Sequence, residues 1–157
     1  MKKRVADIVV ELLMEHGITN AFSVVGGGSM HLNNAFALVK DQIRTVYNHH
    51  EQACAMAAET YARITGKMAA VCVTSGPGGL NTYNGVQGAY VDNIPMIVIA
   101  GHPRYETTVE ATGLHLRCRG VQENDAVTQV KSITKYSAIV TDPYMIKAEV
   151  THAIKTA

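Results

Sequence analysis

His49-His50-Glu51-Gln52-Ala53 and Thr74-Ser75-Gly76-Pro77-Gly78-Gly79-Leu80-Asn81 bound the most informative segment of this chain. Between them, an alanine-rich run predicts a helix over residues 50–65, ended by Gly66 in the usual place after a helix. A continuous apolar run over 68–74 follows, which is typical of a strand covered on both faces. In an α/β sheet, helix starts and the turns that follow strands meet at one edge. The segment can therefore place the lone carboxylate of Glu51 beside a glycine-rich turn.

The flanking sequence continues this alternation of helices and strands. Further strands are expected over 21–25, 43–47, 95–100 and 136–140, and further helices over 5–16, 29–39, 79–91, 124–130 and from 142 onward. Ser29 and Asp142 are the expected helix caps. Residues 101–119 lack periodicity and predict a long loop, which in a compact domain is usually functional or flexible. The pattern predicts a doubly wound α/β fold, with a mostly parallel sheet and helices on both faces, in one domain over 1–157.

Composition excludes several classes of function. The 157 residues are 47% hydrophobic and 17% charged. The net charge of +1 gives no sign of the basic surface that proteins use to bind nucleic acids or anionic membranes. No apolar run approaches the roughly 20 residues that a membrane span needs, and Asp7 and Glu11 argue against a signal peptide. Cys54, Cys72 and Cys118 are widely spaced without a C-x-x-C pair. We therefore expect neither zinc nor a thioredoxin-like site, and a reduced, cytoplasmic compartment.

Glu51 is the residue best suited to chemistry, although the residues alone leave its role open. A carboxylate at a helix start is favoured by the helix dipole and is common. Its place after the 43–47 strand is equally where ligands bind in open α/β sheets. The turn at 74–78 is no Walker A loop, because no Gly-Lys-Ser/Thr follows, and Asn81 stands where G-x-G-x-x-G needs its third glycine. A generic dinucleotide-binding domain is therefore a weak alternative.

These motifs closely resemble the pyrimidine-binding domain of thiamine-diphosphate-dependent enzymes, in the acetolactate synthase group. The matching residues are His50-Glu51-Gln52, Ala57-Ala58-Glu59, Tyr61-Ala62-Arg63, Gly66-Lys67, Thr74-Ser75-Gly76-Pro77-Gly78 and Asn81. The resemblance spans about residues 4–155 and one of the three domains of such an enzyme. It implies that Glu51 is catalytic, contacting the ring nitrogen N1′ of the cofactor aminopyrimidine and stabilising its imino form. It also implies that Pro77, Gly78 and Asn81 bind the aminopyrimidine.

Two further positions follow from the same resemblance. The family often has an aromatic-Pro-Gly-Gly sequence where this chain has Val24-Val25-Gly26-Gly27, which implies cofactor binding by Val24, Gly26 and Gly27. Gln122-Glu123 matches a Gln-Glu pair in which the glutamine lines the substrate end of the site. Val121 stands where phenylalanine is usual, in keeping with a substrate pocket that differs from that of acetolactate synthase.

The resemblance also implies what this chain lacks. In the family, the diphosphate and its magnesium are held by a Gly-Asp-Gly…Asn motif in another domain, and no Asp-Gly dipeptide occurs here. We expect no metal ligands in this chain, and flavin only in the missing middle domain. The expected function is the pyrimidine-binding domain of a 2-oxo acid decarboxylase or carboligase, a lyase or transferase that is inactive as the isolated domain. Its expected partners are a diphosphate-binding domain and further copies of itself, as a homodimer or larger oligomer.

One alternative stays open. A non-catalytic or split-subunit module of the same fold, which needs a partner chain for activity, would also explain the short chain and the missing diphosphate motif. The intact Glu51 argues against a purely structural module, because such a module has no need of that carboxylate.

Overall fold

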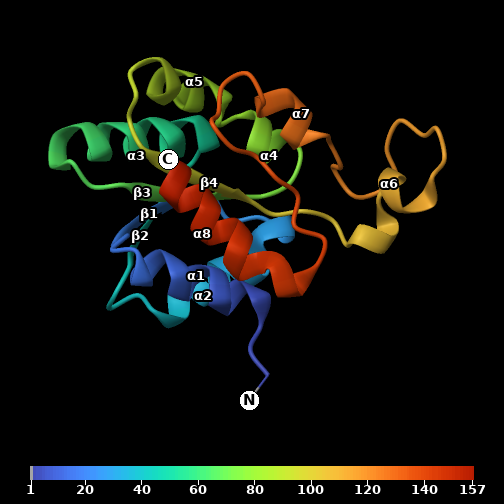
Figure 1. Ribbon diagram of the computed structural model, residues 1–157, viewed down its shortest axis with the longest axis horizontal. Helices are drawn as coiled ribbons and strands as arrows, with labels where there is room; N and C mark the ends of the chain where they lie inside the picture. Colours follow the sequence, from blue (N-terminus) through green and yellow to red (C-terminus); the bar gives the residue numbers. More distant parts are fainter. Residues whose placement is uncertain (1) are drawn as a thin grey trace.

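A parallel four-stranded sheet forms the centre of the computed structural model, which describes residues 2–157 (Figure 1). The strands are β1 (Asn20–Ser23), β2 (Arg44–Tyr47), β3 (Ala69–Val73) and β4 (Met96–Ala100), in the order β2-β1-β3-β4. The register pairs Ser23 with both Tyr47 and Cys72, and Val73 with Ala100. All four strands therefore end at one edge of the sheet, where the expected site residues follow them.

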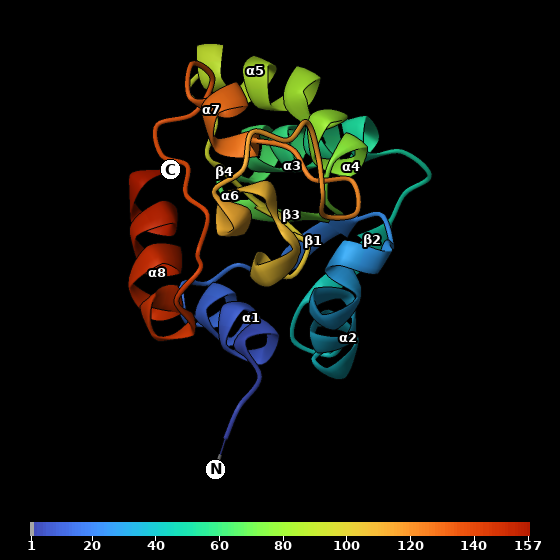
Figure 2. The ribbon, with the colours of Figure 1, turned by 90° about the vertical axis from the view of Figure 1, so that its right-hand side faces the viewer.

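Helices cover both faces of the sheet, which confirms the doubly wound α/β class. Helices α1 (Val5–Glu15), α2 (Met30–Leu38) and α8 (Ile146–Thr156) lie on one face, and α3 (Glu51–Thr65) and α5 (Tyr83–Val91) lie on the other (Figures 1 and 2). Three short helices lie toward the carboxyl ends of the strands: α4 (Pro77–Leu80), α6 (Val109–Thr112) and α7 (Ala126–Val130). Single 3₁₀ turns occupy Gly27–Ser29, Tyr105–Thr107 and Pro143–Met145.

Small residues bring α3 close to its neighbours. Ala58 of α3 is buried in one cluster with Ala69, Val71 and Val73 of β3, and every residue of that strand is buried. A Cβ added to Gly85 of α5 would lie 2.6 Å from the Cβ of Ala55, so the two helices meet backbone to backbone. Gly85 thus marks a close approach between α3 and α5. At Gly88 no described atom lies within 4 Å of such a Cβ, so no close approach occurs there.

A charged cluster ties the same two helices together. The guanidinium of Arg63 on α3 donates to the carboxylate of Glu59 one turn earlier, and at 2.6 Å to Asp92, which follows α5. Exposed ion pairs of this kind contribute little free energy, about 0–1 kcal/mol.

The expected strand over 136–140 is wrong. The segment is not part of the sheet, and no backbone ladder joins it to any described strand. Tyr136 instead packs edge-on against His152 of α8, with ring centroids 4.5 Å apart, and its hydroxyl donates to Glu149 on the same helix. Tyr136 is therefore held by contact with a helix, which a sequence pattern does not distinguish from strand pairing, while Ile139 and Val140 stay exposed.

Smaller differences concern helix ends. The expected helix over 79–91 is two helices, because the Thr82 hydroxyl donates to the Gly79 carbonyl (2.7 Å) between α4 and α5. Ser29 precedes α2, but its hydroxyl bonds Asn33 rather than a backbone amide, so it is no side-chain cap. Gly66 ends α3 with φ 68°, as expected. Asp142 accepts from Tyr144 N and so caps the 3₁₀ turn at Pro143–Met145, whereas α8 itself begins at Ile146 without a side-chain cap. No helix among residues 2–157 is both long and apolar enough to cross a lipid bilayer.

Candidate functional site

The first turn of α3 places Glu51 at the carboxyl edge of the sheet. Strand β2 ends at Tyr47, three residues cross the edge, and α3 begins at Glu51. The backbone N–H of Gln52 donates to the imidazole Nδ1 of His50 at 3.2 Å, so His50 is the side-chain N-cap of α3. Sequence reasoning did not assign this role, because histidine is not among the usual capping residues. The cap fixes the turn that carries the Glu51 carboxylate.

Asn81 holds that carboxylate from across the edge. Its side-chain Nδ2 donates to Glu51 Oε2 at 2.9 Å, which joins the start of α3 to the residue after α4. Within residues 2–157 no hydrogen bond reaches Oε1. A Cβ added to Gly78 would lie 3.4 Å from that same Oε1. The structure thus brings Glu51, Gly78 and Asn81 together, with one carboxylate oxygen held and the other directed toward a bare backbone.

The side chain of Thr74 packs the two glycine-rich turns against each other. A Cβ on Gly26 would lie 2.5 Å from Thr74 Cβ, and one on Gly78 would lie 2.7 Å from Thr74 Cγ2. The Thr74 hydroxyl also accepts from Gly28 N at 3.0 Å. Contacts below 3 Å cannot be accommodated without movement, so the threonine occupies the space that side chains on either turn would need. Gly26 therefore lies next to the Gly78 turn.

A buried chain of hydrogen bonds supports the Gly26 turn from within the core. Ser29 Oγ donates to Asn33 Oδ1 (2.9 Å), Asn33 Nδ2 donates to Ser23 Oγ (2.9 Å), and Ser23 Oγ donates to the Cys72 carbonyl (2.7 Å). Buried polar groups that are fully paired make a segment rigid. Sequence reasoning missed this network. The signal was present as polar residues, Ser23 and Asn33, inside elements otherwise expected to be apolar.

The other expected residues lie around this centre in different settings. Val24 packs half-buried against the core on the α3 face, and Gly27 has no described atom within 4 Å of an added Cβ. Pro77 is the first residue of α4. Gln122 reaches the turn through its backbone, because a Cβ on Gly76 would lie 2.3 Å from the Gln122 carbonyl oxygen. The preceding Val121 is 81% exposed.

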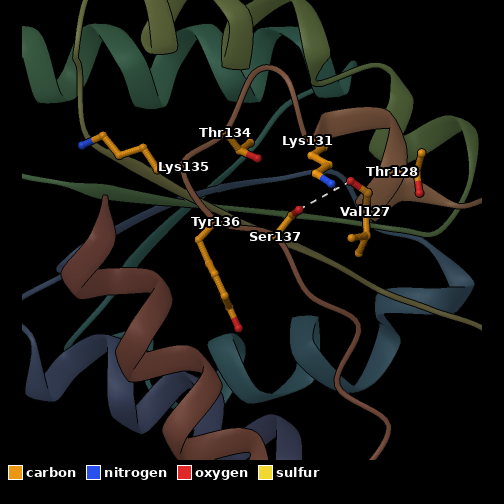
Figure 3. A pocket seen from close by; sticks show the side chains of 7 residues that line it. All are labelled: Val127, Thr128, Lys131, Thr134, Lys135, Tyr136 and Ser137. Atoms are coloured by element: carbon orange, nitrogen blue, oxygen red, sulfur yellow. Dashed lines mark hydrogen bonds between the residues drawn. The ribbon is translucent and has the colours of Figure 1, made fainter.

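A separate cavity of about 420 Å³ lies beyond α7 and is not part of this cluster (Figure 3). Its lining residues are Val127, Thr128, Lys131, Thr134, Lys135, Tyr136 and Ser137. Ser137 Oγ donates to the Val127 carbonyl across it (3.4 Å), while Lys131 and Lys135 extend in different directions and Tyr136 points toward α8. Because the two ammonium groups do not converge, the cavity has no built anion site, and Glu51 remains the centre of the candidate site.

Comparison with known proteins shows which family the chain belongs to. Residues 3–130 match the family described as "Thiamine pyrophosphate enzyme, N-terminal TPP binding domain". The chain is 37% identical over 138 residues to "Acetolactate synthase, chloroplastic" of Arabidopsis thaliana, covering 87% of this chain and 19% of that protein. It is 36% identical over 141 residues to "Acetolactate synthase 1, chloroplastic" of Oryza sativa, covering 87% and 20%.

A bacterial relative gives the same result. The "Acetolactate synthase large subunit" of Buchnera aphidicola from Schizaphis graminum is 34% identical over 135 residues, covering 86% of this chain and 22% of that protein. The chain therefore spans about a fifth of the length of the curated relatives it matches. Because the family match covers residues 3–130, which is most of the chain, this chain belongs to the family of N-terminal TPP-binding domains of thiamine pyrophosphate enzymes.

Proposed function

We propose that this chain is the pyrimidine-binding part of a thiamine-diphosphate-dependent 2-oxo acid decarboxylase or carboligase of the acetolactate synthase kind. The observation that carries the proposal is the Glu51 carboxylate, held through Oε2 by Asn81 and directed through Oε1 toward the bare backbone of Gly78. The names of the plant and bacterial relatives support the acetolactate synthase group.

The residues present fit an aminopyrimidine. A flat heteroaromatic ring needs an edge partner for its ring nitrogen and an approach free of side chains. Glu51 Oε1, which no hydrogen bond reaches within residues 2–157, supplies the first. Gly78 supplies the second, because it has no side chain of its own and its backbone lies next to that oxygen. When bound, thiamine diphosphate supplies a carbon nucleophile that attacks the carbonyl group of a 2-oxo acid. In this proposal Glu51 holds a proton shared with the ring nitrogen, and Asn81 keeps the carboxylate in the orientation that this requires.

The rest of the active site comes from elsewhere in the assembly. The sequence has no Asp-Gly dipeptide, so we assign the diphosphate and its magnesium to a partner domain, and any flavin to a middle domain. An oligomer, a dimer or larger, is supported by large apolar side chains exposed on α3 and α5: Met56, Ile64, Tyr90 and Val91. A cytoplasmic location stays a prediction that rests on the free cysteines, two of them buried.

The proposal is tested with the pyrimidine half of the cofactor, 4-amino-5-hydroxymethyl-2-methylpyrimidine, titrated into the 157-residue chain and followed by NMR. We expect shifts at the Asn81 side-chain amide and the Gly78 N–H. Glu51→Gln keeps the shape of the side chain but loses its charge, so we expect at least tenfold weaker binding. Glu15→Gln, on an exposed helix end, is the matched control. Absence of binding by the unaltered chain, or equal binding by Glu51→Gln, would refute the proposal.

A second measurement tests the division of labour between domains. Calorimetry with thiamine diphosphate and magnesium should give no tighter binding to this chain than the pyrimidine fragment does. A clear gain from the diphosphate would mean that the chain holds both ends of the cofactor. In the assembly with a diphosphate-binding domain, Glu51→Gln should lower turnover by about 10²- to 10⁴-fold, the usual value of a positioned proton-transfer group. Near-normal turnover would favour the non-catalytic module.

A further inference from the structure

The loop from His102 to Glu123 leaves the end of β4 and returns to the candidate site. It contains the Tyr105–Thr107 turn and α6, and Figure 1 shows α6 projecting beyond the body of the domain on the side of the strand ends. Thr108 is 1% exposed, and its hydroxyl donates to the Tyr105 carbonyl at 2.7 Å. The loop is therefore folded on itself and is more ordered than its lack of periodicity suggested.

The carboxylate of Glu123 fastens this loop. Its Oε1 accepts from Val109 N at 2.8 Å, and its Oε2 accepts from Gly120 N at 2.9 Å and Arg119 N at 3.3 Å. The donors come from two separate places, the start of α6 and the turn at 119–120. Val109 N is one of the backbone donors that a helix start leaves without a partner inside the helix. One side chain thus satisfies three amides and closes the loop.

The neighbouring residue, Gln122, transmits this closure to the site. Gln122 has φ 56°, a conformation that costs a non-glycine residue free energy and persists only where its surroundings hold it. Its carbonyl oxygen lies 2.3 Å from where a Cβ on Gly76 would be, so the two backbones are in contact. Gly76 in turn begins the turn of α4, with its carbonyl accepting from Leu80 N at 3.0 Å. Asn81, which holds Glu51, follows directly.

We propose that Glu123 is a positioning residue of the candidate site: it clamps the 102–123 loop so that the backbone of Gln122 buttresses the turn from Gly76 to Asn81. The inference rests on the proposed function for its consequence, although the clamp itself does not. The charge matters because both carboxylate oxygens accept. In a glutamine, the amide oxygen could replace one of the two carboxylate oxygens as an acceptor. The NH₂ group would take the place of the other oxygen and face backbone N–H donors, with which it cannot form a hydrogen bond.

The clamp is tested by amide hydrogen exchange on the full 157-residue chain. Glu123→Gln should speed exchange of the Val109, Arg119 and Gly120 amides at least tenfold. The matched control is Glu110→Gln, on α6 of the same loop, whose carboxylate makes no hydrogen bond within residues 2–157. It should exchange at the unaltered rate. Unchanged exchange at the three amides in Glu123→Gln would overturn the clamp.

A second variant keeps the proposal falsifiable if Glu123→Gln fails to fold. Val109 is the first residue of α6, a position that proline favours, and the preceding Thr108 has the extended backbone (φ −83°, ψ 161°) that proline requires of its neighbour. Val109→Pro therefore removes one donor to Glu123 and preserves the helix. Faster exchange at Arg119 and Gly120 is expected. Rates equal to those of the unaltered chain would contradict the clamp.

The positioning role is tested by affinity for the pyrimidine fragment. Glu123→Gln should bind the fragment about three- to tenfold more weakly, Glu110→Gln should bind normally, and Glu123→Asp, which keeps the charge on a shorter stem, should recover part of the loss. Normal binding by a Glu123→Gln chain whose loop exchanges faster would refute the positioning role and leave the proposed function intact. Failure of the unaltered chain to bind would refute the proposed function, and this role with it, even where exchange reveals the clamp.

Discussion

Replacement of Gly76 by alanine tests the contact between the Gly76 turn and the Gln122 backbone. Gly76 has φ 62° and ψ −123°, a region that side-chain-bearing residues rarely adopt, which costs roughly 1–3 kcal/mol. The new methyl group would also meet the Gln122 carbonyl oxygen at 2.3 Å, and because that atom is backbone, it cannot rotate away. Overpacking of this kind costs about 1–3 kcal/mol. Gly76→Ala should therefore destabilise the fold by roughly 2–6 kcal/mol.

Gly66→Ala is the matched control for this experiment. Gly66 also has positive φ (68°), but no described atom lies within 4 Å of an added Cβ, so only the backbone cost of about 1–2 kcal/mol remains. Urea unfolding gives both values from the midpoint and slope. Gly76→Ala should also loosen the 102–123 loop in hydrogen exchange, and Gly66→Ala should not. Equal destabilisation by the two variants, with unchanged loop exchange, would refute the argument that Gln122 rests on Gly76.

Two more predictions concern titratable groups. Burial raises the pKa of the Cys72 thiol to about 12, and Cys54 is buried as well. At about pH 8 only the exposed Cys118 should therefore react rapidly with a thiol reagent, whereas all three cysteines should react after unfolding. Rapid modification of a second thiol in the native chain would contradict this. Burial opposes the charge of Glu123, but three backbone N–H groups, with His102 contributing less, bring its pKa below the ordinary 4.5. The clamp should hold above pH 4.5 and be lost as the pH falls through that lower pKa. The protection factor of the Val109 amide reports this loss, and Glu123→Gln should abolish its pH dependence.

Much of the candidate site was visible in the sequence because it is encoded locally. Glu51 at a helix start and the Gly76–Asn81 turn after a strand are short-range patterns, and parallel strands bring them to the same edge. The His50 cap and the packing of Thr74 against Gly26 were not visible. Both features depend on which atoms come into contact after folding. Histidine is not specific for capping a helix, and threonine is not specific for packing against a glycine turn.

The sequence by itself determined the alternation of helices and strands, the edge at which the glycine turns gather and the resemblance that points to an aminopyrimidine. Those features follow from hydrophobic periodicity and from residues close together in the chain. Only the tertiary structure decided that Tyr136 packs on α8 and that residues 136–140 do not join the sheet. It alone decided that Glu123 closes a loop and brings Gln122 onto Gly76. These outcomes come from contacts between residues distant in the chain, where a hydrogen bond or a steric limit, and no local pattern, selects the arrangement.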